Sequence, residues 1–288
     1  MGEKGQEKSL SHFQIAWKNF GRNRTGVAGA IIVILILLVA VFSPLLAPQD
    51  PLKMTPRKLQ SPSKAHLLGT DQFGRDQLSR LIYGTKTSMA VSFGAVGMAV
   101  LWGILLGLIS GYYGGKIDNV IMRCLDVIFA FPLFLLALVI VAVLGPSLKN
   151  LILTIGFIYA ATFARIVRGS VLSLREKEFV ESARSMGARD ASIIYHFIFP
   201  NILSPVIVQA TFNLSTAIMI EAALSFLGLG TQPPDPAWGL MLNESRSFME
   251  ISPSMAIFPG TAIMLAVLGF NLLGDGLRDA LDPRMVSR

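Results

Sequence analysis

Long stretches without a charged residue divide this sequence, and they limit what it can fold into. Four of them cover residues 25–49, 87–115, 127–148 and 251–274. A helix rises about 1.5 Å per residue, so a bilayer core of about 30 Å is crossed by roughly 20 apolar residues. Charged residues make up only 15% of the chain, against about 25% in soluble domains. The pattern predicts an all-α integral membrane protein.

Six transmembrane helices are expected, separated by turns, prolines and charge. We place them at about 26–46, 88–112, 119–144, 150–170, 201–228 and 254–275. Residues 26–288 would form one membrane domain, with Pro132 and Pro259 kinking their helices. Residues 1–25 precede it, and their apolar side chains recur at spacings of three and four. This pattern predicts an amphipathic helix that lies in the membrane interface or, equally, packs on the cytosolic face of the protein.

Two long loops join these spans on one side. In the first, between spans one and two, Leu78, Leu81 and Ile82 predict a short helix that buries its apolar face. The second covers residues 229–253, and we expect its Trp238 to anchor at the membrane interface.

Lysine and arginine counts predict the orientation. With the N-terminus inside, the inner segments carry 16 of these residues and the outer segments 9. The loop after span four contributes most, and Arg165 and Arg168 at its start are placed to reach the same aqueous side. Positive residues favour the cytosol, so both termini and this loop are expected there.

Composition excludes several other functions. The net charge of +7 fits contact with anionic lipid. Nucleic-acid binding is not predicted, because the sequence has no basic stripe with interleaved aromatic residues. One cysteine and three scattered histidines predict no disulfide and no metal site. The first apolar stretch is longer than that of a cleavable signal peptide.

Two groups of residues inside the spans suggest packing or function. Gly103, Gly107 and Gly111 recur every fourth residue in span two and predict a close helix contact, within this chain or with another. Gln209, Asn213 and Glu221 lie in span five. Polar residues at membrane depth either line a transport path or hydrogen-bond neighbouring helices, and both readings stay open.

A compact charged stretch at 175–190 predicts an elbow outside the membrane. Phe179, Val180, Ala183 and Met186 would form one apolar side of a first helix, which Gly187 ends. Asp190 is a good N-cap for a second short helix, and Pro200 and Pro205 would mark the return into the membrane. Such an elbow suits docking to a partner, although an inert loop is the alternative.

The spacing in this elbow resembles the EAA motif of ABC importer permeases. That motif reads Glu-Ala-Ala, three residues, Gly, nine residues and Ile-x-Leu-Pro. Glu181, Ala183, Gly187 and Pro200 match it, while Ser182, Phe197 and Phe199 depart from it. The resemblance implies ATPase coupling through the loop 171–200, and the residues assigned to it are Glu181, Ala183, Arg184, Gly187, Asp190, His196 and Pro200.

Four further segments are similar to the C-type permease subunits of the dipeptide, oligopeptide and nickel uptake family. They are residues 66–88, 111–132, 221–239 and 271–284. The resemblance implies the type I importer fold in the cell membrane, with a homologous second permease, two cytosolic ATPase subunits and an external substrate-binding protein as partners. It also implies that this chain catalyses no reaction and needs no cofactor, because the partner ATPases bind ATP and Mg²⁺. The sequence agrees, since it lacks a G-x-x-x-x-G-K-[ST] loop.

The function expected from the sequence is peptide import driven by ATP hydrolysis in partner subunits. Nickel or another small solute carried by the same scaffold is the first alternative. An ion-coupled carrier acting alone, with Glu221 as a relay, and a membrane anchor that only recruits a partner are the others.

Overall fold

The computed structural model describes residues 18–281, and the named elements within them are all helical. They are α2 (Arg24–Val41), α3 (Ser43–Leu46), α4 (Gln77–Tyr113), α5 (Gly115–Phe129), α6 (Leu133–Leu144), α7 (Leu148–Arg175), α8 (Glu178–Ser185), α9 (Asp190–Ile193), a π-helical turn (Ile194–Ile198), α10 (Phe199–Phe226), α11 (Trp238–Ser245), a 3₁₀ turn (Arg246–Phe248) and α12 (Ser254–Leu281). Most of the interfacial helix predicted for residues 1–25 lies outside the described residues, apart from a helical segment at 18–22.

Five helices in the described part of the chain are long and apolar enough to cross a membrane, and a bent pair brings the number to six. The pair is α5 and α6, which replaces the single span predicted at 119–144 and bends by 87°. The break falls at Pro132, because proline has no N–H to donate and disfavours helical geometry at the residue before it. Pro259, in contrast, lies inside the continuous α12.

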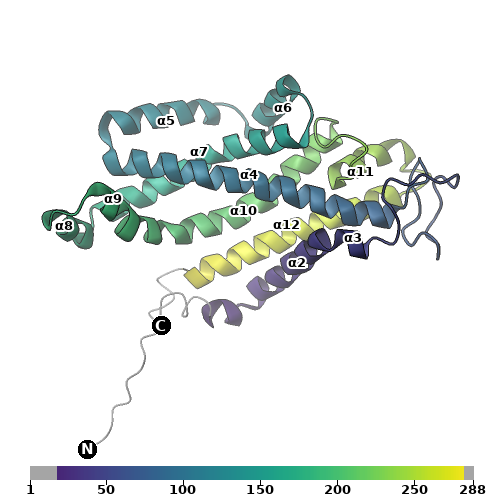
Figure 1. The fold of residues 1–288 in the computed structure, drawn as a ribbon, viewed down its shortest axis with the longest axis horizontal. Coiled ribbons are helices and arrows are strands. Elements are labelled where there is room, and N and C mark those ends of the chain that lie inside the picture. The colour runs from purple at the N-terminus through teal and green to yellow at the C-terminus, as the bar shows by residue number, and fades with distance from the viewer. Residues whose placement is uncertain (1–17, 282–288) are drawn as a thin grey trace, which may run out of the picture.

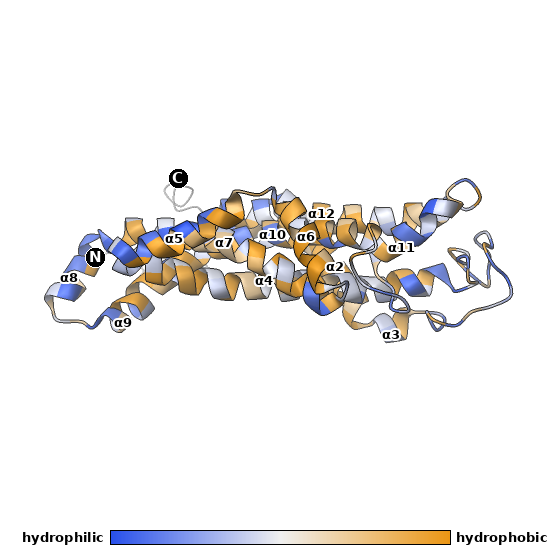
Figure 2. Ribbon diagram, turned by 90° about the horizontal axis from the view of Figure 1, so that it is seen from above, coloured by the Kyte–Doolittle hydropathy of each residue, from blue (hydrophilic) through white to orange (hydrophobic). Residues whose placement is uncertain are grey.

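The long helices run side by side along the molecule. Figure 1 shows α8 and α9 at one end and the segment between α3 and α4, with α11, at the opposite end. The start of α2 and the end of α12 lie toward the α8–α9 end. Hydrophilic residues gather at these two ends, and apolar residues cover the middle (Figure 2). This distribution is that of a bundle crossing a bilayer.

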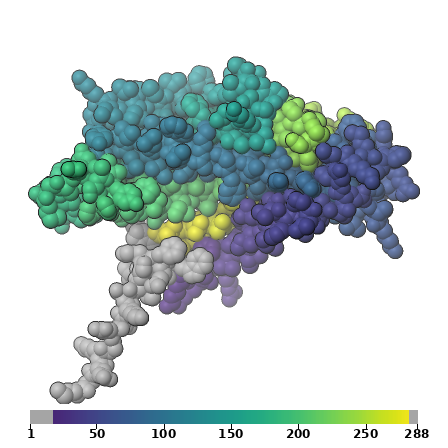
Figure 3. Space-filling view, in the orientation of Figure 1, coloured from purple at the N-terminus to yellow at the C-terminus, as the bar shows by residue number. Residues whose placement is uncertain are grey.

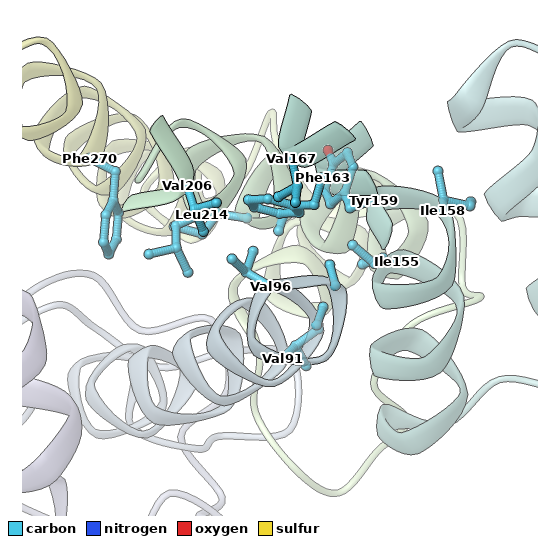
Figure 4. Close-up of a cluster of buried hydrophobic side chains, with 14 of the residues drawn as sticks. Val91, Val96, Ile155, Ile158, Tyr159, Phe163, Val167, Val206, Leu214 and Phe270 are labelled. Carbon is cyan, nitrogen blue, oxygen red and sulfur yellow. The ribbon is translucent and has the colours of Figure 1, made fainter. Parts of the chain in front are cut away.

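The core forms where α4, α7, α10 and α12 meet. Figure 4 shows side chains of these helices pointing toward one another, among them Val96, Phe163, Leu214 and Phe270. The glycine face of α4 packs against α7 of the same chain. A Cβ on Gly107 would come within 2.6 Å of the Ala164 carbonyl oxygen, and one on Gly111 within 2.8 Å of the Val171 Cβ. These glycines therefore let the two backbones approach.

Span five differs from its predicted form. The segment from Asp190 to Phe226 is one apolar helical run, so Pro200 and Pro205 do not separate a short helix from a span. A π-helical turn precedes Pro200, and in it the Phe199 N–H donates to the Ile194 carbonyl. A π-helical turn is wider than an α-helical one and accommodates irregular positions within a helix, so the helix continues past Pro200.

Candidate functional site

The elbow is a helix, a glycine turn and a second helix, and it forms one tip of the molecule (Figure 3). Gly187 ends the first arm with φ of +81°, in the left-handed region. The Ala188 N–H donates to the Ala183 carbonyl at 3.1 Å, and the Gly187 N–H donates to the Arg184 carbonyl at 2.9 Å. These two bonds make a Schellman motif, so the turn has a defined geometry.

The apolar side of α8 is only partly buried. Val180 and Ala183 are buried, so this part of the predicted apolar side faces the protein itself and is not available to a partner. Ala183 instead packs in the hydrophobic core. Phe179 and Met186 are exposed, Met186 by 80%. The first arm thus seats two small apolar residues inside and leaves two large ones outside.

The other six predicted coupling residues lie on the outer surface. Glu181, Arg184, Gly187, Asp190, His196 and Pro200 are all exposed. A Cβ on Gly187 would meet no atom within 4 Å. The His196 ring nitrogen Nδ1 lies 3.1 Å from the Ser192 carbonyl, on the same side of the second arm. These positions are available to a partner.

Asp190 does not have the predicted N-cap role. Arg189 occupies the cap position, and Asp190 is the first residue of α9. Its Oδ1 accepts a hydrogen bond of 2.7 Å from the hydroxyl of Tyr112, at the end of α4. The carboxylate therefore joins α9 to α4 and does not cap α9 itself.

Arg165 and Arg168 bind α5, whereas the sequence analysis expected them to extend toward water. Arg168 donates two hydrogen bonds of 2.5 Å to Asp118, which also accepts one of 2.6 Å from Ser110. Arg165 pairs with Asp126 at 2.9 Å. Charged groups near the elbow therefore hold α4, α5 and α7 together.

The polar residues of α10 divide into two kinds. Gln209 is half-buried, and its Nε2 donates to the Asn213 Oδ1 at 2.8 Å. Glu221 is fully buried in this chain, and its two carboxylate oxygens accept bonds from Ser225 at 2.8 Å and Ser88 at 3.1 Å. These contacts are those of a strut, a residue that hydrogen-bonds its own helix to a neighbouring one.

At the far end, a buried ionic cluster joins the first long loop to α11. Arg75 donates to Asp71 at 2.6 Å and to Glu244 at 3.0 Å, and Arg80 donates to Glu244 at 2.9 Å. Arg80 is 1% exposed. We call the segment 47–76 together with α11 the external cap, because it lies outside the apolar middle of the bundle (Figure 2). The sequence analysis did not predict this cluster, because Glu244 lies 169 residues from Arg75 and 164 residues from Arg80 along the chain.

The cap also corrects two sequence predictions. Leu78, Leu81 and Ile82 are only half-buried, whereas the polar side of this first part of α4 is buried against the ionic cluster. Trp238 is 1% exposed and its indole N–H donates to the Leu81 carbonyl at 3.2 Å. It is a core residue of the cap and not an interfacial anchor.

Within the described residues, no group of three or more His, Cys, Asp or Glu side chains could hold a metal ion. The arrangement instead offers two hydrophilic ends, an exposed elbow and a folded cap, connected by apolar helices.

Comparisons with known proteins agree with this geometry. Residues 103–287 match the family described as binding-protein-dependent transport system inner membrane component. Residues 11–62 match the N-terminal TM domain of oligopeptide transport permease C.

Two curated relatives extend over nearly the whole chain. The dipeptide transport system permease protein DppC of Alkalihalophilus pseudofirmus is 48% identical over 98% of this chain and 93% of its own. The glutathione transport system permease protein GsiD of Pectobacterium atrosepticum is 45% identical over 94% of this chain and 91% of its own.

Solved structures show the same fold at low sequence identity. The inward-facing MetNI methionine ABC transporter matches with a TM-score of 0.57 and 18% identity, over 70% of this chain and 96% of that one. An amino acid ABC transporter with histidines matches with a TM-score of 0.55 and 19% identity, over 69% and 92%. The chain therefore belongs to the family of binding-protein-dependent transport system inner membrane components and is a permease subunit of an ABC importer.

Proposed function

We propose that this permease imports peptides and that the elbow couples it to cytosolic ATPase subunits. The observation that carries the coupling role is the exposed turn at Gly187, where a defined Schellman geometry leaves open space around a residue without a side chain. A groove on a partner can receive such a turn closely. The names of the relatives, a dipeptide and a glutathione permease, support a peptide substrate.

The orientation follows from the elbow. We place α8 and α9 in the cytosol together with both termini, because the start of α2 and the end of α12 lie toward the same end of the bundle (Figure 1). The external cap then faces the opposite side. Residues 50–87 and 229–253 are the proposed docking region for the substrate-binding protein.

The proposed transport path runs along α10 where this chain meets a homologous second permease. Gln209 is only half-buried, and Ile207 and Met219 on the same helix are exposed by 45% and 54%. An incompletely covered helix with polar groups suits the boundary with another subunit. Gln209 and Asn213 are proposed for the path, and Glu221 is proposed as a strut beside it.

The chain itself is proposed to bind neither ATP nor Mg²⁺. A phosphate-binding loop of the G-x-x-x-x-G-K-[ST] type is absent from the sequence, so the partner ATPases would supply these ligands and the hydrolysis. Lipid covers the apolar belt.

A substitution in the elbow tests the coupling role. Gly187→Trp puts a bulky side chain where a partner would dock, and it should reduce uptake at least tenfold while leaving the chain inserted in the membrane. Its control is Gly145→Trp, because Gly145 also has a left-handed φ, of +87°, and open space around its Cα. Both variants place a side chain at a positive φ, and the backbone cost is at least as high at Gly145, whose ψ of 151° puts it in a region essentially restricted to glycine. Gly145 lies between α6 and α7, away from the elbow.

The measurements are uptake of a labelled dipeptide by cells and copurification of the ATPase. Wild-type uptake by the Gly187→Trp variant would contradict the coupling role. Uptake of nickel in place of the dipeptide would leave the coupling role intact and reassign the substrate. Uptake driven by an ion gradient in the purified single chain would support the carrier that acts alone.

A further inference from the structure

The end of α4 is held to the elbow by side chains of both arms. Tyr112, in the last turn of α4, is 7% exposed, and its hydroxyl donates to Asp190 at the start of α9 at 2.7 Å. The guanidinium carbon of Arg184, on α8, lies 5.9 Å from the centre of the Tyr112 ring. That distance is within the range of about 6 Å for a cation–π contact. Tyr112 therefore touches the elbow on both sides of Gly187.

A third contact lies beside the first two. Arg175, the last residue of α7, donates to the Gly111 carbonyl at 3.1 Å. It binds α4 at the residue before Tyr112, where the chain leaves α7 and enters the elbow. The final turn of α4 is thus bound by α7, α8 and α9.

These contacts matter because α4 is not directly followed or preceded by the elbow in the chain: α5, α6 and α7 lie between them. Two residues, 176 and 177, join α7 to α8, and α9 continues through the π-helical turn into α10. Displacement of the elbow can pull α7 and α10 through the chain itself. It can reach α4 only through side-chain contacts or through the packing of neighbouring helices.

The other end of α4 belongs to the external cap. The helix is continuous for 37 residues, a length of about 55 Å at 1.5 Å per residue. In its first turn Ser79 donates to Asp76 at 2.7 Å, and Arg80 donates to Glu244 of α11 at 2.9 Å. One uninterrupted helix thus connects the elbow with the cap (Figure 1).

We propose that Tyr112 is a positioning residue that passes displacement of the elbow to α4 and, along this helix, to the external cap. The proposal rests on the coupling role of the elbow and adds to it a specific route across the membrane. The hydroxyl and the ring act together, because the hydrogen bond holds α9 and the ring face receives Arg184 of α8. Loss of the hydroxyl alone should loosen this route without removing the packed ring.

The test uses the full importer, reconstituted in proteoliposomes with the second permease, the ATPases and the binding protein. The variants are Tyr112→Phe, Asp190→Ala and the double variant, and the quantity measured is ATP hydrolysed per dipeptide imported. Loss of this hydrogen bond should raise the ratio by about two- to tenfold in each single variant. The double variant should match the single ones, because both remove the same interaction.

The control is Tyr113→Phe, since Tyr113 is the adjacent residue and is 53% exposed, and its ring meets the Tyr112 ring edge-on at 5.3 Å, a contact that phenylalanine keeps. It should keep the wild-type ratio. A wild-type ratio for Tyr112→Phe would overturn the proposal. So would a raised ratio accompanied by a lower melting temperature or by loss of ATPase copurification, because the role would then be structural. If the wild-type chain itself fails to bind an ATPase, the coupling role of the elbow fails, and the route through Tyr112 fails with it.

Discussion

At the scale of single residues, the buried carboxylate of Glu221 organises the loop after α10. Ser225 and Ser88 donate to it, and each serine oxygen also accepts a backbone N–H. Ser225 accepts from Thr231 in the loop after α10 at 3.3 Å, and Ser88 accepts from Trp238 at the start of α11 at 3.4 Å. One side chain therefore satisfies two hydroxyl groups that in turn fix residues 231 and 238. An ionisable residue in a membrane helix can serve architecture as well as transport.

We expect Glu221→Ala to lower the stability of the permease by about 1–3 kcal/mol for each serine hydroxyl left without a partner. Glu221→Gln is the matched control, because an amide of nearly the same size can accept from one serine and donate to the other. Thermal unfolding of the detergent-solubilised chain measures the difference. Normal unfolding of Glu221→Gln together with loss of uptake would instead place the carboxylate in the transport path.

At the scale of elements, the contact between α4 and α7 depends on positions without a side chain. A Cβ on Gly107 would lie 2.6 Å from both the Ala164 carbonyl oxygen and the Val167 Cβ, and neither atom can move without shifting α7. Lipid gives no hydrophobic drive for helix association, so this close packing is itself a source of stability.

Gly107→Ala should destabilise the helix pair by about 1–3 kcal/mol, because overpacking forces the backbones apart. Gly97→Ala lies on the same helix, and a Cβ there meets nothing within 4 Å. It should be neutral or slightly stabilising, since alanine favours helix over glycine by about 1 kcal/mol. Melting temperatures of the two variants decide the matter, and equal values would show that the glycine face does not set the packing.

At the scale of the whole molecule, ion pairs hold the external cap together, although only 15% of the residues in this chain are charged. Arg75, Arg80, Asp71 and Glu244 form one cluster that is almost wholly removed from solvent. Burying charges costs free energy unless each has its partners. The cluster is therefore stable only when the first loop and α11 are both in place, which makes the cap a single unit.

Arg80→Ala should open this unit and cost about 3–5 kcal/mol, because it leaves Glu244 partly unpaired in a buried site. Lys64→Ala, in the same loop but at an exposed position, should change stability by less than about 0.5 kcal/mol. Limited proteolysis of the loop on intact membranes, followed over time, measures the opening. Equal cleavage rates for the two variants would show that the cluster does not hold the cap closed.

The sequence predicted the all-helical membrane fold and the elbow, because hydrophobic runs and the Gly187 turn are local signals. It failed where distant residues meet. Two of the lysine and arginine residues counted outside the membrane, Arg75 and Arg80, are buried against carboxylates, so they carry less information on topology than the count assumes. Asp190 was read as a local cap because Tyr112, its actual partner, is 78 positions away.

The broken span of α5 and α6 has a consequence for how the protein enters the membrane during synthesis. α6 has 12 residues, about 18 Å of helix, which is too short for a hydrocarbon layer of about 30 Å. α5 carries four charged side chains and cannot make up the difference as a free segment. Only three residues separate α6 from α7. We therefore expect the translocon to release α6 into lipid together with α7, as a helical hairpin. Insertion of α6 would then wait until α7 has been synthesised.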